Sequence, residues 1–512
     1  MFLITRIRGC QVKEYRLKPI TAGRREAVSG NAEQAPSVWW VLASLSLSML
    51  LSSLGTSIAN VGLPALAQAF NASFQEVQWV VLTYLLAMTL LIVSVGRFGD
   101  ITGRRRLLLL GIFLFTVASI LCGVSPTLWL LIAARALQGL GAAIMMSLSM
   151  ALIGETVPKE KTGSAMGLLG TMSAMGTALG PSLGGVLIAG IGWPAIFLIN
   201  IPLGILALLL AYRYLPVDRQ GPKTGRASFD IMGTLLLALT LAAYALAMTV
   251  GRGSFGQINM VLLLLAVFGV GLFVLAETRA ASPLIHLAMF RNPVLSAGFA
   301  MSTMVTTVVM ATLVVGPFYL SGALLLDAAR VGLVMSSGPI VAALTGVPAG
   351  RVVDRFGAHR MSIVGLIGMT LGSTILPMLS TRFGVPGYIA PLVIITAGYA
   401  LFQAANNTAV MTNIRPDQRG VISGMLNLSR NLGLITGASV MGTVFAIGSA
   451  TTNLMSAHPE AVAAGMRTTF AVAAALMVNA LAIASLSYAL SRRAVLPNRE
   501  RENGSGLEEF SE

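Results

Sequence analysis

Two arginines lie inside long apolar segments of this 512-residue chain, where a charged side chain is rare. Arg135 lies within LIAARALQGLGAA, and Arg430 lies well inside a later apolar segment. An arginine in hydrocarbon costs at least about 2.5 kcal/mol, so it usually faces a partner, a cavity or a ligand. Gln138 follows Arg135 by three residues and shares its helix face. These side chains predict a polar site that binds a small molecule within an apolar protein.

A stripe of small polar side chains runs along the apolar segment that ends in LGTSIANVGLP, residues 54–64. Thr56 and Asn60 continue a spacing of four residues that starts at Ser44. Because four residues turn a helix by about 400°, these side chains form one slowly drifting stripe. With polar residues of later segments added, the candidate substrate-binding residues are Thr56, Asn60, Arg135, Gln138, Gln403, Asn407 and Arg430.

The composition requires a membrane around these residues. Hydrophobic residues make up 55% of the chain and charged residues only 10%, whereas a soluble domain has about 25% charged residues. Runs of about 20 apolar residues predict fourteen membrane-spanning helices. They lie near 38–60, 77–96, 107–124, 127–153, 164–189, 193–214, 230–250, 259–277, 294–320, 328–350, 361–380, 387–411, 420–447 and 468–490.

The basic residues predict the orientation of these helices. With the N-terminus inside, 28 of the 34 Lys and Arg residues lie in inner segments and four in outer loops. This asymmetry is typical of the positive-inside rule, so both termini are predicted to be cytoplasmic, in a multi-pass plasma or inner membrane protein. The net charge of +15 therefore reports topology and does not indicate a nucleic-acid partner. Residues 1–37 form a basic tail without the apolar core of a secretory signal.

Two loops show that the chain contains an internal repeat. GRFGDITGRRR at 96–106 and GRVVDRFGAHR at 350–360 share Gly, Arg, Asp, Gly and Arg at five aligned positions. Since the loop recurs eight spans later, two six-helix halves require two inserted spans, an organisation typical of transporters. The predicted parts are a tail at 1–37, a first half at 38–215, a linker with two inserted helices at 216–290, a second half at 291–490 and a cytoplasmic tail at 491–512.

The first of these loops resembles the signature between the second and third helices of the major facilitator superfamily. The fifth span resembles that family's antiporter signature, and the closest match is the fourteen-helix drug:proton antiporter family. The resemblance implies an all-α polytopic membrane protein with the major facilitator fold. It also implies a cytoplasmic latch at Asp100 and Arg104, with Asp354 as a weaker counterpart. The residues that match the antiporter signature are Gly167, Gly176, Gly180, Pro181, Gly184 and Gly185.

The antiporter segment also has a direct physical interpretation. Gly176, Gly180 and Gly184 repeat every four residues and leave a strip on which another helix can approach closely and slide. Pro181 removes a backbone donor and bends the helix.

The resemblance implies a secondary active exporter of small organic molecules that works by alternating access, with protons as the coupling ion. The alternative is a major facilitator importer or uniporter of a small metabolite. A membrane subunit of a proton-pumping complex is a weaker alternative, and a membrane-embedded enzyme is not expected. The pump needs lysines and glutamates inside the membrane, and the enzyme needs clustered catalytic groups, neither of which the spans contain. No catalytic residue, metal site or cofactor is predicted, and the sequence gives no evidence for a periplasmic adaptor.

One departure from the family bears on the substrate. The first-helix signature of the fourteen-helix family normally has an Asp where this chain has Gly55, and every acid here lies in a tail, a loop or at the end of a span. A cavity with two arginines and no acid favours neutral or anionic substrates over cations.

Overall fold

The computed structural model describes most of the chain as long helices. The described residues are 38–92, 95–157, 162–217, 231–250, 256–280, 287–411, 419–450 and 457–508. Within them, fourteen helical segments are long and apolar enough to cross a membrane, which confirms the predicted number of spans. The predicted tail at 1–37 and most of the linker after Val217 lie outside the described residues.

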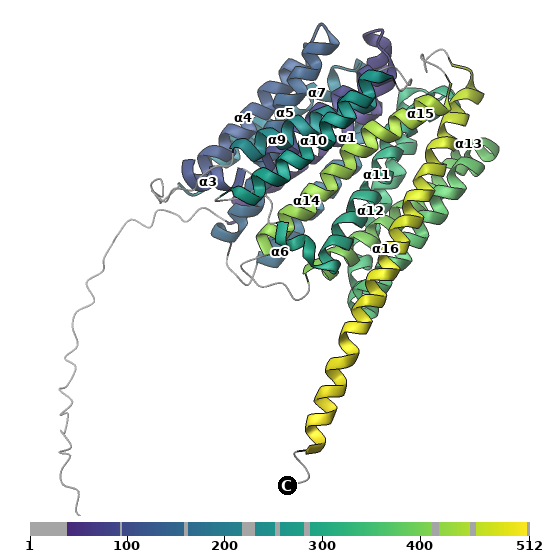
Figure 1. Cartoon of the computed structure of the whole chain (residues 1–512). Coiled ribbons are helices and arrows are strands. Elements are labelled where there is room, and N and C mark those ends of the chain that lie inside the picture. The colour runs from purple at the N-terminus through teal and green to yellow at the C-terminus, as the bar shows by residue number, and fades with distance from the viewer. Residues whose placement is uncertain are drawn as a thin grey trace, which may run out of the picture.

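The first half of the chain forms six spans. Its first helix continues past Pro64 to Ala69, farther than the sequence indicated. Figure 1 shows this half on one side of the bundle, in purple and blue. Its helices are α1 (Val38–Ala69), α2 (Phe74–Ile92), α3 (Val95–Thr102), α4 (Arg104–Gly123), α5 (Leu128–Thr156), α6 (Thr162–Ile191) and a sixth span made of α7 (Ala195–Leu198) and α8 (Asn200–Tyr214).

The second half also forms six spans, drawn in green and yellow in Figure 1. Helix α13 contains two spans, because Gly384, at φ 59° and ψ −131°, turns the chain between them. Helix α16 continues past the apolar window that ends at Ala489, so part of the predicted tail is helical. The helices are α11 (Pro293–Gly322), α12 (Ala328–Phe356), α13 (Ala358–Met411), α14 (Arg419–Thr436), the π-helical turn η3 (Gly437–Met441), α15 (Gly442–Gly448) and α16 (Pro459–Glu508).

The repeated loops have the same backbone turn in both halves. The sequence suggested a glycine-rich loop, but most of the first motif is helical in α3, and the turn occurs at Gly103 with φ 96°. Gly357, its aligned partner, turns the chain between α12 and α13 with φ 88°. Positive φ favours glycine because it has no Cβ. The shared turn therefore supports the internal repeat with backbone geometry.

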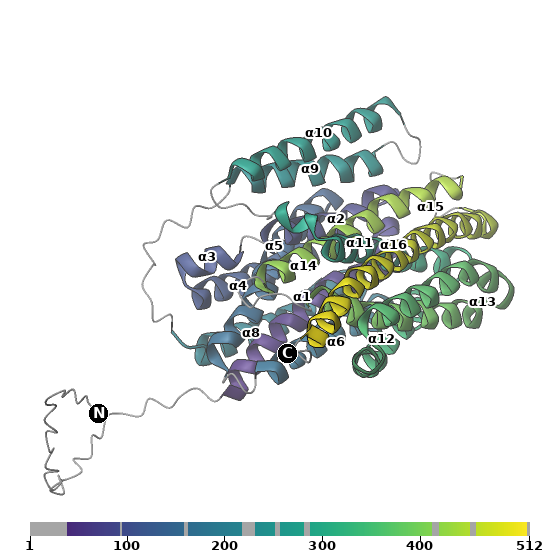
Figure 2. The same cartoon turned by 60° about the horizontal axis from the view of Figure 1, so that its bottom comes forward.

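The two inserted spans form a hairpin on the outside of the bundle. Helix α9 (Ile231–Thr249) packs against α10 (Gln257–Arg279) and contacts α2 and η3, whereas α10 forms the outermost layer (Figure 2). Large apolar side chains of α10, such as Leu264 and Phe268, are exposed, as expected of a helix that faces lipid.

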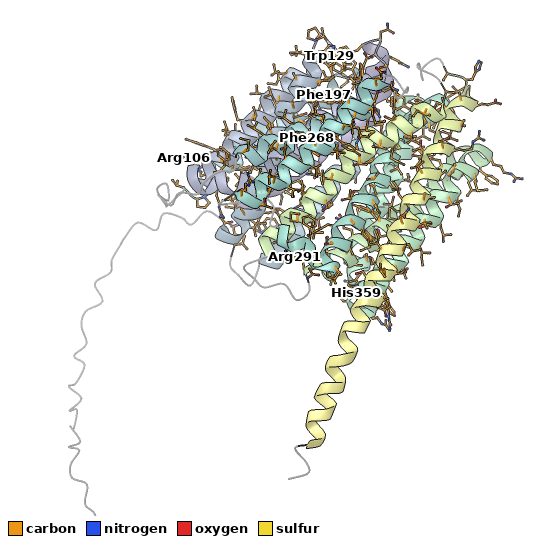
Figure 3. The ribbon with its side chains drawn as sticks, in the orientation of Figure 1. Arg106, Trp129, Phe197, Phe268, Arg291 and His359 are labelled. Carbon is orange, nitrogen blue, oxygen red and sulfur yellow. The ribbon has the colours of Figure 1, made fainter. Side chains whose placement is uncertain are left out.

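An aromatic cluster joins the halves at the end of the bundle where α1 ends and α2 begins; we call it the Phe74 end. The Phe74 ring lies 4.6 Å from the Phe318 ring of α11 and 5.6 Å from the Phe445 ring of α15 (centroid distances), both edge-on. Figure 3 shows Trp129 toward this end and His359 toward the opposite end, which we call the Arg104 end. The conformation is thus closed at the Phe74 end.

Candidate functional site

Helix α6 packs against α1 through the predicted glycine strip. At Gly184 an added Cβ would lie 2.6 Å from Val61 Cγ1 of α1, and at Gly180 it would clash with the Ser57 side chain. The Ser57 hydroxyl donates to the Gly176 carbonyl at 3.2 Å, which the close approach of the two backbones allows. The strip that the sequence predicted therefore makes a close helix contact within the first half.

The same helix also forms part of the seam between the halves. An added Cβ at Gly185 would lie 2.6 Å from the Ala328 carbonyl oxygen and 2.9 Å from Gly332 Cα, both of α12. An added Cβ at Gly332 would in turn meet the Pro181 carbonyl oxygen. Helix α6 thus presents its central glycines to α1 and its Phe74 end to the other half.

Gly180→Ala is expected to lower the free energy of unfolding by about 1–3 kcal/mol, because the added methyl group overpacks a rigid backbone contact. The midpoint of thermal unfolding of the purified protein measures this effect. Gly170→Ala is a matched control on the same helix, since an added Cβ there meets nothing within 4 Å. Equal midpoints for the two variants would contradict the tight α1–α6 contact.

Arg135 lies entirely inside the first half. Its side chain is 0% exposed, and its Nε donates to the Val80 carbonyl at 2.8 Å. Its Nη1 donates to Gln138 Oε1 at 2.5 Å, and the guanidinium lies 4.1 Å from the centre of the Tyr84 ring. Gln138 Nε2 in turn donates to the Ser119 hydroxyl of α4 at 2.7 Å. These partners belong to α2, α4 and α5, so Arg135 and Gln138 are bonded within the first half in this conformation.

Gly55 lies beside this network, at the position where the family signature has an Asp, and two aromatic side chains surround it. An added Cβ would lie 3.2 Å from both the Tyr84 hydroxyl oxygen and the Phe115 ring. The Tyr84 hydroxyl donates to the Ser52 carbonyl of α1 at 2.8 Å. Aromatic side chains therefore fill the space that a carboxylate at position 55 would need, and the Arg135 guanidinium faces a ring.

Thr56 and Asn60 lie on a different face of α1. Ser57 faces α6, Gly55 faces α2 and α4, and Gly62 faces α7, where an added Cβ would meet Ile196. The remaining face carries Thr56 and Asn60, and α1 also contacts α11 of the second half. At about 100° per residue, we therefore expect this face to turn toward the interior between the halves, and the Thr56 hydroxyl donates back to the Ser52 carbonyl at 3.1 Å. Asn60 is 1% exposed, and its Oδ1 has no hydrogen-bond partner.

Arg430 occupies the corresponding interior face of α14. An added Cβ at Gly433 would meet Thr303 and Thr306 of α11, whereas the Ala438 carbonyl accepts a hydrogen bond from Gln78 of α2. On a helix wheel Arg430 falls between these two faces, and α2 and α11 both also contact α1. We therefore expect its half-buried side chain to face the same interior region as Thr56 and Asn60.

Two further predicted residues lie in the second half on α13. Gln403 is half-buried, but Asn407 is exposed. Its neighbour Asn406 is the buried amide, and its Nδ2 donates to the Gly298 carbonyl of α11 at 3.2 Å. Asn406 therefore joins helices within the second half, and the structure gives no contact that links Asn407 with Arg430.

The predicted latch lies at the Arg104 end. Asp100 is in the last turn of α3, but its side chain lies outside the described residues. Arg104 Nη1 is 3.5 Å from the Ala151 carbonyl near the end of α5, a favourable place for a cation because the helix dipole is negative there. Asp354 is exposed in the last turn of α12. The latch remains a prediction.

Two features of the structure, the Phe74 cluster and the position of Tyr84, had no clear signal in the sequence. The Phe74 cluster joins residues that are more than two hundred positions apart, and phenylalanine is common in spans. Nothing in the spacing of Tyr84 indicates that it stacks on Arg135 and binds α1.

The sequence model of the Major Facilitator Superfamily matches residues 45–438. The chain belongs to this family. It is 31% identical over 411 residues to the riboflavin transporter RibZ of Clostridioides difficile, covering 80% of this chain and 88% of that protein. It is 32% identical over 428 residues to the drug efflux pump JefA of Mycobacterium tuberculosis, covering 81% and 82%.

Solved structures of the superfamily agree in fold. A bacterial homologue of the human lysosomal transporter Spinster, in an inward-facing and occupied conformation, superposes with a TM-score of 0.67 at 16% identity, covering 88% of this chain and 96% of that chain. Because the chain belongs to this family, it has the major facilitator fold and is a multi-pass membrane transporter.

Proposed function

We propose that this chain is a secondary active exporter of small organic molecules, that it works by alternating access, and that protons drive it. The proposal is supported by the helix-wheel positions of Thr56 and Asn60 on α1 and of Arg430 on α14, since both helices contact elements of the opposite half. A polar site between two six-helix halves is where such transporters bind substrate. The efflux pump JefA among the relatives, and the antiporter motif on α6, support export over import.

The contacts at the Phe74 end support alternating access. The aromatic cluster and the Gly185–Gly332 contact close that end, and transport requires them to open when the halves rock. Helix α6 is suited to such a movement, since its glycines let backbones slide without interlocking side chains. The basic loops predict that the Phe74 end is the outer side and that both termini are cytoplasmic in an inner membrane.

The charges of the interior favour a neutral or anionic substrate. Within the described helices, acids occur near helix ends, such as Glu76 in the first turn of α2 and Glu277 in the last turn of α10. A lipophilic cation that entered the interior would meet Arg430 without a membrane-embedded carboxylate to balance it. A relative is named a riboflavin transporter, and riboflavin is an uncharged heterocycle at neutral pH, so it is the first compound to test.

Transport assays with dyes of different charge test the substrate class. We expect riboflavin or an anionic dye to be exported and the cation ethidium not to be, because the acids of the described helices lie near helix ends, away from the interior site. Fluorescence of cells with and without the expressed protein measures both. Robust ethidium export that stops when the proton gradient is collapsed would contradict this substrate class.

Inside-out membrane vesicles with an imposed pH gradient test direction and coupling. Substrate uptake into such vesicles, driven by an acidic interior, corresponds to export by proton antiport. Uptake without dependence on the gradient would contradict proton coupling, and movement only in the opposite direction would make the chain an importer.

A further inference from the structure

The inserted hairpin meets both halves at one place near the Phe74 end. Its centre is Gln78 of α2, which is 1% exposed and donates from Nε2 to the Ala438 carbonyl at 2.9 Å across the seam. Ala438 lies in the π-helical turn η3, where the widened turn changes the usual pairing of helix carbonyls. Gly442 completes the socket, because any Cβ there would collide with the Gln78 amide nitrogen.

Two adjacent residues of α9 bind opposite halves beside this socket. Trp79 of the first half donates from Nε1 to the Thr249 hydroxyl at 3.1 Å. Thr443 of the second half donates from its hydroxyl to the Met248 carbonyl. Met248 is in the last turn of α9, where helix carbonyls lack partners within the helix, so a side chain from another element satisfies it.

The second inserted helix fixes this end of α9. Asn259 in the first turn of α10 is 3% exposed, and its Nδ2 donates to the Ala247 carbonyl at 2.8 Å and to the Val250 carbonyl. These carbonyls flank the two residues that bind the halves. Helix α10 thus holds the end of α9 in the geometry that the bridge needs, although its other face is exposed.

We propose that the inserted hairpin is a clasp that stabilises the state closed at the Phe74 end, with Gln78 as the positioning residue at its centre. In the closed state α9 is bonded to Trp79 in one half and to Thr443 in the other. When the halves separate at this end, the hairpin can follow only one of them, so at least one of these bonds and the Gln78 contact must break. The clasp raises the free energy of opening. This proposal rests on alternating access.

Distances between spin labels at the Phe74 end test the clasp on the full-length protein without substrate. Labels are attached to Gln68→Cys at the end of α1 and Arg330→Cys near the start of α12, both exposed positions, with Cys10 replaced by Ser and the buried Cys122 left in place. We expect one short distance without further change. Gly442→Ala and Thr249→Val should each add a longer component, because the first expels Gln78 and the second removes the acceptor of Trp79.

Matched controls separate the clasp from general damage. Gly424→Ala lies on α14 where an added Cβ meets nothing within 4 Å, and it should leave the distance unchanged. Thr249→Ser keeps the hydroxyl and should also retain the short distance. If Gly442→Ala does not yield folded protein, Gln78→Ala removes the same hydrogen bond without adding bulk and should give the longer component.

Unchanged distances in folded Gly442→Ala and Thr249→Val would overturn the proposal. A longer component in Gly442→Ala alone would overturn the role of the hairpin, because Gln78 would then act without α9. Since the measurement needs neither substrate nor proton gradient, an error in the proposed export function would leave the result unaffected.

Discussion

Arg430→Ala is expected to lower the transport rate of a neutral or anionic substrate by about 10- to 100-fold. A hydrogen bond to a charged group contributes about 1.5–3 kcal/mol, and each 1.4 kcal/mol corresponds to roughly a factor of ten. Because Arg430 is half-buried on the interior face of α14, its removal opens space toward the interior and should cost little stability. Initial uptake rates into inside-out vesicles, normalised to the amount of folded protein, measure the effect.

Two further variants show whether the loss is specific to this guanidinium. Arg467→Ala removes the same charge from an exposed position on α16 and should transport at the wild-type rate. Arg430→Lys keeps the charge but loses the planar set of donors, so it should retain more transport than the alanine variant. A wild-type rate in Arg430→Ala would remove this residue from the site and with it the main argument for the substrate class.

The sequence predicted the fold because its signals are local. Hydropathy identifies each span from its own residues. Likewise, Gly103 and Gly357 mark turns because positive φ favours glycine, whatever the rest of the fold. The glycine strip at Gly180 was predictable for the same reason, since small residues at a spacing of four reveal a close contact whatever the partner is.

The sequence did not predict which helix faces meet. It placed Arg135 and Arg430 at one cavity, whereas the structure buries the first among α2, α4 and α5 and leaves the second on the interior face. Depth in the membrane follows from position along a span, but direction depends on packing among helices that are distant in sequence. The contact between Gln78 and Ala438 spans 360 residues and needs a π-helical turn, for which propensity gives no rule.

Arg135→Ala is expected to destabilise the first half by about 2–5 kcal/mol, because truncating a buried side chain leaves a cavity and takes hydrogen bonds from buried polar groups. The side chain is 0% exposed, and its loss leaves a cavity beside Tyr84 and removes the guanidinium hydrogen bonds to the Val80 carbonyl and to Gln138. In contrast to Arg430, the first effect is therefore on folding. The midpoint of thermal unfolding in detergent, together with the yield of monodisperse protein, measures it.

Arg135→Met separates packing from charge in the same network. Methionine fills much of the volume and adapts to irregular space beside the Tyr84 ring. It also removes a buried charge whose described partners are the Tyr84 and Phe197 rings, a carbonyl and an amide, with no carboxylate among them. It should therefore unfold at a higher temperature than Arg135→Ala. Equal midpoints for wild type and Arg135→Ala would contradict the structural role. A stable Arg135→Met variant that does not transport would show that the guanidinium acts in transport beyond its packing, beside the Tyr84 ring whose hydroxyl donates to the Ser52 carbonyl.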